Sequence, residues 1–181
     1  RLLILLSLTN GVVGLERLSA SILSPFLVAD LGLTNTQLGL LAAALSGAVA
    51  ISATGFARLA DRSGRQKAIL LTATICFSII AGLPAIVSGF LGLFFVRMLL
   101  GIAEGPVVPL SQSMMAEVSG PRRLGLNMGL LQMAGAYLIG GIAGPVLATH
   151  IAQEHGWRTA FTASAIPGLV IALAIWLVAR P

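Results

Sequence analysis

Charged side chains are scarce in this sequence. Only 9% of its 181 residues are Asp, Glu, Lys or Arg, whereas a soluble globular domain carries about 25%. Hydrophobic residues make up 57% of the chain. Too few charges remain to keep a folded surface in water, so the composition excludes an ordinary soluble domain and predicts an integral membrane protein.

The sequence also lacks the alternation of polar and apolar residues that marks the strands of a membrane β-barrel. Apolar blocks such as 38–54 and 69–90 run without it. A membrane helix needs about 20 apolar residues, so the chain accommodates about six helices joined by short loops. We therefore predict an all-α, polytopic membrane protein, a bundle of six transmembrane helices over residues 1–181. The predicted spans are 2–27, 37–57, 68–89, 91–115, 124–149 and 159–179.

Motifs of common enzyme classes are missing. No Walker A glycine–lysine pair is present, which excludes ATP as the direct energy source. The two histidines, His150 and His155, are spaced as neither an H-E-x-x-H nor an H-x-x-E-H zinc motif. No histidine falls at mid-span to serve as the base of an intramembrane hydrolase. We expect no enzymatic activity, no metal and no cofactor.

Cysteine is nearly absent as well. Cys76 is the only one, so an intrachain disulfide is excluded. The chain opens at Arg1 and not at a methionine, and its first apolar run is too long for the core of a signal peptide. We expect the sequence to be a fragment of a longer protein.

Basic residues gather in the loops on one side of the predicted bundle. Eight Lys and Arg residues fall on that side and one, Arg158, on the other. Because Lys and Arg are enriched in cytoplasmic loops, we predict that both chain ends and the 2–3 and 4–5 loops are cytoplasmic. The net charge of +5 then reflects orientation, and we expect no nucleic-acid binding. The eight are Arg1, Arg58, Arg62, Arg65, Lys67, Arg122, Arg123 and Arg180.

Four charged residues lie inside predicted spans: Glu16 and Arg17 in the first, Arg97 and Glu104 in the fourth. Each costs at least about 2.5–3.5 kcal/mol near the bilayer centre, so the four must pair or face water. One interpretation is a set of structural ion pairs that hold helices together. The other, which we favour, is a water-filled cavity in which a carboxylate takes up protons and an arginine holds an anion.

The spacing of these residues indicates how they meet. With a rise of 1.5 Å per residue, Glu16, Arg17 and Glu104 fall near mid-membrane and Arg97 about 10 Å nearer the outside. Arg97 and Glu104 are seven residues apart, so they share a helix face but are too distant for direct contact. We expect each to reach across to another helix.

Small residues and prolines cluster around Glu104. Gly101, Gly105, Pro106 and Pro109 lie in the fourth span, and the fifth span repeats the theme with glycines four residues apart. Small residues allow close helix packing, and a proline leaves a backbone carbonyl without its helical hydrogen bond. Close helix packing alone would account for these glycines and prolines. The presence of Glu104 among them favours a functional role for the segment.

The segment at 57–67, Ala-Arg-Leu-Ala-Asp-Arg-Ser-Gly-Arg-Gln-Lys, resembles the signature of the loop between spans two and three in the major facilitator superfamily. Asp61, Arg62, Gly64 and Arg65 match at the right spacing. The resemblance implies that this loop is a conformational latch between two six-helix halves, formed by these four residues. The alternative is a solvated basic loop that only sets orientation.

The intramembrane residues resemble those of the anion:cation symporter branch of the same superfamily, with the spinster-like lipid transporters second. The resemblance implies that Arg17 binds a substrate carboxylate, that Glu16 and Glu104 carry protons, and that Arg97 partners one of the carboxylates. Two amides, Asn10 and Gln132, are further candidates for substrate binding. The pattern that carries this likeness is Glu16-Arg17, Arg97, Gly101-x-x-Glu104-Gly105-Pro106, Arg122, Asn127 and Gly-Trp-Arg-Thr-Ala-Phe at 156–161.

By this resemblance we expect the N-terminal six-helix half of a twelve-helix secondary transporter in a cell membrane, most simply the bacterial inner membrane. Its function would be proton-coupled symport of an organic anion, a carboxylate or sugar acid, by alternating access. Its partners would be the small-molecule substrate, protons, the lipid bilayer and a missing C-terminal half. The alternative is a proton-coupled exporter or antiporter of amphiphilic or lipid-like solutes, because Gly140-x-x-x-Gly144-Pro145 partly resembles the antiporter signature of drug exporters.

Overall fold

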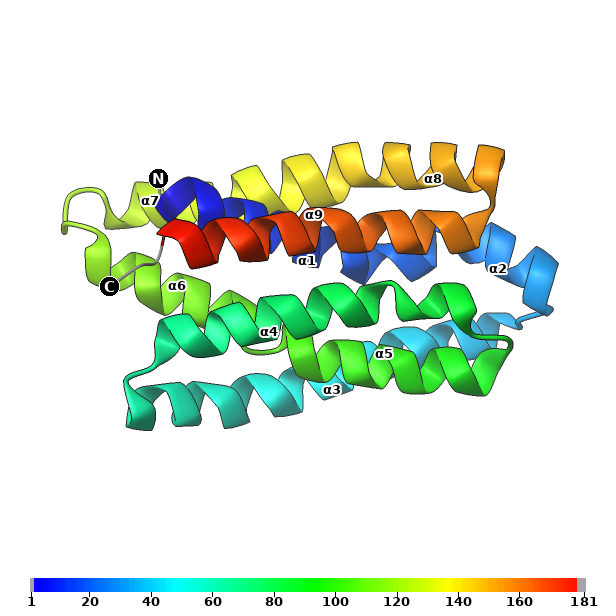
Figure 1. Ribbon diagram of the computed structural model, residues 1–181, viewed down its shortest axis with the longest axis horizontal. Coiled ribbons are helices and arrows are strands. Elements are labelled where there is room, and N and C mark those ends of the chain that lie inside the picture. Colours follow the sequence, from blue (N-terminus) through cyan, green and yellow to red (C-terminus); the bar gives the residue numbers. More distant parts are fainter. Residues whose placement is uncertain (1, 179–181) are drawn as a thin grey trace.

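The described part of the chain contains six helical segments that are long and apolar enough to cross a membrane (Figure 1). The computed structural model describes residues 2–178, apart from the side chains at positions 61, 134, 136 and 178. This part of the chain contains no strand, which confirms the predicted all-α six-helix membrane bundle. The elements are α1 (Leu2–Ile22), α2 (Ser24–Leu31), α3 (Asn35–Ser63), α4 (Gln66–Ala81), η1 (Leu83–Ile86), α5 (Phe90–Glu104), α6 (Val107–Val118), α7 (Leu124–Gln132), η2 (Met133–Ala143), α8 (Gly144–His155) and α9 (Trp157–Val178).

Several spans are interrupted where the sequence predicts continuous helices. The first breaks at Leu23, just before Pro25 in the first turn of α2, and the fourth breaks at Gly105 and Pro106. Proline lacks a backbone N–H and clashes with the preceding turn, so each break coincides with one. The third span ends in a 3₁₀ turn, η1, that contains Pro84. The middle of the fifth span, η2, is a π-helix, which hydropathy does not distinguish from an α-helix.

The second span has clear end signals. Thr34 accepts a hydrogen bond from the Gln37 N–H, and the Gln37 side chain accepts one from the Thr34 N–H, which together form a capping box. At the other end Gly64 has a φ of 63°, a left-handed conformation that glycine adopts without a steric penalty. α3 therefore runs beyond the predicted end at 57, through the basic segment to Ser63.

α1 occupies the centre of the helix arrangement. It packs against α6, α7, η2, α8 and α9 and also contacts α3. α3 lies along α5, and α4 lies along α9. The two spans least buried within the bundle are α3 and the one made of α7, η2 and α8.

Glycines bring two helix pairs into close contact. A Cβ atom at Gly101 would lie 2.8 Å from the Ala48 Cβ, and one at Gly105 would lie 2.9 Å from the Val49 carbonyl oxygen. A Cβ atom at Gly135 of η2 would overlap the main-chain carbonyl of Ser7 on α1. Backbone-to-backbone contact of this kind is typical of glycine-rich membrane helix pairs. It holds α5 against α3 at the level of Glu104.

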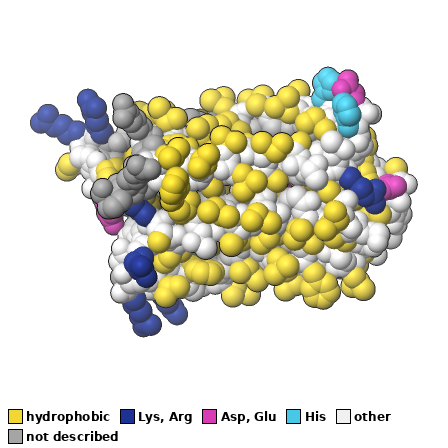
Figure 2. Space-filling model, in the orientation of Figure 1, with side chains coloured by type: hydrophobic (Ala, Val, Ile, Leu, Met, Phe, Trp, Pro, Cys, Tyr) yellow, Lys and Arg dark blue, Asp and Glu magenta, His cyan; other side chains and the backbone are white. Residues whose placement is uncertain are grey.

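The two ends of the molecule differ in their content of basic residues. Basic side chains cluster at the end where α1 begins, and an apolar belt separates them from the opposite end (Figure 2). α9 ends at this same basic end (Figure 1). Its cytoplasmic placement stays a prediction, and Arg1 and Arg180 of the charge count lie outside the described residues. The described basic residues there are Arg58, Arg62, Arg65, Lys67, Arg122 and Arg123, all exposed.

At the opposite end an ion pair joins α2 to α9. Arg158 donates to the Asp30 carboxylate at 2.6 Å, the Trp157 indole N–H donates to the same oxygen at 3.0 Å, and the Arg158 guanidinium stacks on the Trp157 ring. These two hydrogen bonds hold the pKa of Asp30 below its ordinary value of 3.8. The contact therefore ties the two helix ends together in its ionised form.

We expect Gly105→Ala to lower the free energy of unfolding by about 1–3 kcal/mol, because the added methyl meets the α3 backbone, which cannot rotate away. Gly55→Ala is the matched control, since a Cβ atom there meets nothing within 4 Å. Thermal unfolding of the full-length protein in detergent measures both. Equal melting temperatures for the two variants would contradict the close α3–α5 contact.

We expect Asp30→Asn to lower the Tm by about 1–3 °C at pH 7. Because the folded pKa of Asp30 is depressed, its stabilisation is present above the unfolded pKa and is lost as pH falls through the folded value. The difference between wild type and variant should therefore shrink below pH 4. Glu154→Gln, which removes an exposed carboxylate at the same end, is the control. An undiminished difference at low pH would show that the ion pair is not responsible.

Candidate functional site

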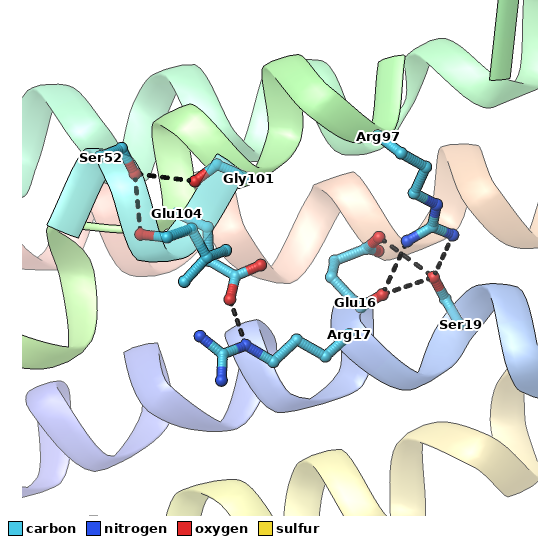
Figure 3. Close-up of polar contacts among 8 residues, drawn as sticks. Glu16, Arg17, Ser19, Ser52, Arg97, Gly101 and Glu104 are labelled. Carbon is cyan, nitrogen blue, oxygen red and sulfur yellow. Dashed lines mark hydrogen bonds and ion pairs between the residues drawn. The ribbon is translucent and has the colours of Figure 1, made fainter. Parts of the chain in front are cut away.

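The site is built around an ion pair between α1 and α5. Arg17 donates through Nε to Oε1 of Glu104, so the first and fourth spans meet here as predicted (Figure 3). The two members differ sharply in exposure. The Glu104 side chain is fully buried, whereas the Arg17 side chain is 46% exposed. One end of the pair is thus accessible and the other is sealed.

A second polar cluster lies beside the pair, where Arg97 of α5 also reaches α1 (Figure 3). Arg97 Nη1 donates to the main-chain carbonyl of Glu16 at 3.1 Å, and Nη2 donates to Ser19 Oγ at 3.0 Å. Ser19 Oγ in turn lies 2.7 Å from the Glu16 carbonyl and 3.4 Å from its carboxylate. Arg97 therefore holds α1 through a backbone carbonyl and a hydroxyl.

The contacts of Arg97 bear on its predicted role as the partner of a carboxylate. Arg97 interacts electrostatically with Glu16, whereas its hydrogen bonds within the described residues go to the Glu16 main-chain carbonyl and to a hydroxyl, so the role stays a prediction. The expectation that Arg97 and Glu104 reach across to another helix is confirmed, since both contact α1. Every residue type has the same main-chain carbonyl. The sequence therefore does not indicate that Arg97 hydrogen-bonds to one.

Two carboxylate oxygens in the site have no hydrogen-bond partner among the described residues: Oε1 of Glu16 and Oε2 of Glu104. Both side chains are buried, and Arg97 is only 2% exposed. An unpaired oxygen in such surroundings is costly when the group is ionised, and protonation removes that cost. Each carboxyl therefore has room for a proton.

Two small hollows meet at Arg17, and together they are called the Arg17 cleft. One, of about 250 Å³, has the lining residues Arg17, Ala42, Leu45, Ser46, Val49 and Ala50. The other, of about 260 Å³, has the lining residues Arg17, Ala20, Ser21, Ser24, Leu38, Gly39, Leu41, Ala42, Leu45 and Arg97. The cleft therefore lies between α1 and α3 and has Arg17 at its centre.

The burial of the two glutamates bears on the predicted water-filled cavity. In this conformation Glu16 and Glu104 are buried and line neither of the two hollows, so proton uptake by a carboxylate in such a cavity stays a prediction. Arg17 alone is both charged and exposed there. α3 fills the remaining space, because Gly101 and Gly105 allow its backbone to approach α5 at Glu104. Ser52 Oγ of α3 fastens this contact with a hydrogen bond to the Gly101 carbonyl at 3.1 Å (Figure 3).

Comparisons with known proteins decide the family. The model of the Major Facilitator Superfamily matches residues 6–181. The chain belongs to the major facilitator superfamily. Its members are transporters and not enzymes, and the protein is accordingly a multi-pass membrane protein.

Individual superfamily members resemble the chain over part of their length. The hexuronate transporter of Bacillus subtilis (strain 168) is 32% identical over 167 residues, which are 92% of this chain and 39% of that protein. The multidrug export protein EmrB of Escherichia coli (strain K12) is 28% identical over 94% of this chain and 33% of its own length. The chain thus spans between a third and two fifths of these relatives.

A solved structure of the superfamily has the same fold. The proton:xylose symporter XylE, bound to 6-bromo-6-deoxy-D-glucose, superimposes with a TM-score of 0.75 at 21% sequence identity. The match covers 97% of this chain and 44% of that one. The six-helix bundle described here is therefore a half-length portion of the superfamily fold.

The two predicted amides lie outside the Arg17 cleft. Asn10 of α1 is 2% exposed, and neither atom of its amide has a hydrogen-bond partner within the described residues. Gln132 is the last residue of α7 and is exposed. Neither residue lines the cleft, so their roles in substrate binding stay predictions.

The superfamily loop motif joins α3 to α4. Arg62 and Arg65 are exposed at the basic end, and Gly64 lies in the left-handed turn between the two helices. The side chain of Asp61 lies outside the described residues. The left-handed turn explains the glycine in the motif, and the latch role of the four residues stays a prediction.

Sequence reasoning missed Ser19 and Ser52. Ser19 lies three residues after Glu16, so it falls on the same helix face and could have been found from that spacing. Ser52 has no charged neighbour in the sequence. Its role depends on the contact between α3 and α5, which only the structure shows.

We expect Ser19→Ala to lower the free energy of unfolding by about 1.5–3 kcal/mol, because it leaves a buried guanidinium N–H of Arg97 without its acceptor. Ser111→Ala is the matched control, since that buried hydroxyl donates only within its own helix, to Val107 O. Denaturant or thermal unfolding of the full-length protein measures both. A smaller loss for Ser19→Ala than for Ser111→Ala would contradict the cluster.

Proposed function

We propose that this chain is the six-helix half of a proton-coupled secondary transporter that moves an organic carboxylate across the bacterial inner membrane by alternating access. The observation that carries the proposal is the Arg17–Glu104 pair, which is half exposed to a cleft at one end and buried at the other. The sequence likeness to a hexuronate transporter supports an organic anion as the solute.

The first step is anion capture by Arg17. A guanidinium offers a planar fork of N–H donors that matches a carboxylate. Glu104 takes Nε of Arg17, and the terminal nitrogens have no hydrogen-bond partner in the described part of the chain, so they are available to a solute in the cleft. A carboxylate that binds there competes with Glu104 for the same cation.

The second step is proton uptake by Glu104. When Arg17 turns toward a bound anion, the buried Glu104 carboxylate loses its cationic partner. An unpaired charge in that position is unfavourable, so the carboxyl binds a proton. The free Oε2 atom is one site where that proton can reside. Anion binding and proton binding then favour one another, which is the requirement for symport.

Glu16 and Arg97 have supporting roles in this proposal. Glu16 is a second buried carboxyl with a free oxygen and so a second proton site. Arg97 lies between α5 and α1 and keeps the Glu16 turn in place through two hydrogen bonds. The loop residues Asp61, Arg62, Gly64 and Arg65 would latch this half to the second one during the transport cycle.

A second candidate is a proton-coupled exporter of amphiphilic solutes. It is favoured by the likeness to a multidrug export protein. An antiporter needs solute and proton to compete for one site, so in this candidate the solute would displace the proton from Glu104 and would not favour its binding. The two candidates differ in the sign of the coupling between proton and solute fluxes.

We expect Glu104→Gln to abolish accumulation driven by a pH gradient and to leave exchange of labelled for unlabelled solute measurable. The variant keeps the side-chain volume but removes the proton site. Full-length protein in proteoliposomes, with labelled benzoate and glucuronate outside and a pH-sensitive dye inside, measures both activities. Glu154→Gln, an exposed carboxyl far from the pair, is the control.

The outcomes separate the candidates. Symport predicts that solute entry acidifies the lumen, whereas an exporter predicts that solute and protons move in opposite directions. Intact pH-driven accumulation in Glu104→Gln would remove Glu104 from the coupling role. Unchanged uptake in Arg17→Gln would remove Arg17 as the anion site.

A further inference from the structure

We infer that the Arg17 cleft selects a monocarboxylate with an apolar body over a polyhydroxylated sugar acid. The inference rests on the proposed function, because it takes Arg17 as the anion site, and it adds the chemical class of the solute. It is carried by the chemistry of the walls around the Arg17 guanidinium.

The cleft offers one accessible cation. Arg17 is 46% exposed and lines both hollows. Arg97 borders one hollow but is 2% exposed, and both of its terminal nitrogens are occupied by Glu16 O and Ser19 Oγ. No other Lys, Arg or His lines either hollow in the described chain. One cation matches one carboxylate, so a dicarboxylate would leave its second charge uncompensated.

The walls facing Arg17 are almost entirely aliphatic. Beyond the arginine, the hollow of about 250 Å³ is bounded by Ala42, Leu45, Val49 and Ala50, with Ser46 as its single hydroxyl. All five residues belong to α3, so one helix face forms this wall. A solute with its carboxylate on Arg17 therefore places its body against methyl groups, which favours an apolar body.

Hydroxyl groups are few in the other hollow, of about 260 Å³, as well. It contains two, on Ser21 and Ser24, and the Ser24 hydroxyl already donates to the Ser21 carbonyl at 2.7 Å. A hexuronate carries several hydroxyls, and each one that packs against these walls loses water there. Every hydroxyl left without a partner weakens binding by about tenfold. These described walls provide too few partners for a sugar ring.

The position of Val49 makes the inference testable by a single atom exchange. Its backbone is fixed, because the Gly101 and Gly105 contacts hold α3 against α5 at this point. Val49→Thr replaces one methyl by a hydroxyl of nearly the same size and so adds a hydrogen-bonding group to the wall without widening it. Ala42→Ser adds a hydroxyl elsewhere on the same wall and serves as a second variant if Val49→Thr does not fold.

Labelled benzoate and glucuronate are the probes, compared in proteoliposomes of the full-length protein. We expect the half-saturation concentration for benzoate to be at least about tenfold lower than that for glucuronate. Val49→Thr should narrow this ratio by about threefold or more. Ile51→Thr is the matched control: it makes the same kind of change on α3 but lies outside the Arg17 cleft and is 78% exposed. It should leave the ratio unchanged.

Three results would overturn the inference. A preference for glucuronate that is lost in Arg17→Gln would leave the proposed function standing and refute the solute class. An equal effect of Val49→Thr and Ile51→Thr on the ratio of the two half-saturation concentrations would show that the α3 wall does not discriminate between benzoate and glucuronate. Absence of saturable uptake of both acids, with no effect of Arg17→Gln, would refute the carboxylate function and the inference together.

Discussion

The contact between Arg17 and Glu104 is the interaction on which the rest of the structure depends. A buried ion pair contributes little net stability by itself, because the cost of removing two charges from water offsets most of their attraction. Here the desolvation is one-sided, since the glutamate is sealed and the arginine is half exposed. Such a pair stays sensitive to what enters the adjoining cleft, which a fully buried pair would not be.

The glycines of α5 create this asymmetry. Side chains at Gly101 and Gly105 would clash with α3 and push it away from α5 at the level of Glu104. Their absence brings the two backbones together, and Ser52 fastens them with a hydrogen bond across the contact. On the other side, Arg97 attaches α5 to α1 through Glu16 and Ser19. The glutamate is thus enclosed by packing on both sides, and Arg17 is its hydrogen-bond partner within the described residues.

The sequence predicted much of this arrangement, and for physical reasons. Lipid demands long apolar helices, so hydropathy located the six spans. The high cost of charge in lipid singled out Glu16, Arg17, Arg97 and Glu104 before any contact was known. The features that the sequence did not predict depend on α3 or on main-chain atoms. The burial of Glu104 requires α3, and the acceptor for Arg97 is a main-chain carbonyl, which every residue type provides alike.

The π-helix at 133–143 has a consequence for any attempt to map the fifth span. Its hydrogen bonds join residues five apart instead of four, so side chains advance around the axis by less than 100° at each step. A helical-wheel projection that starts in α7 and assumes 3.6 residues per turn therefore assigns side chains of α8 to the wrong direction around the axis. Spin-label or crosslinking pairs between α1 and α8 must be chosen on each side of the segment separately, because periodicity counted from Leu124 points to the wrong face.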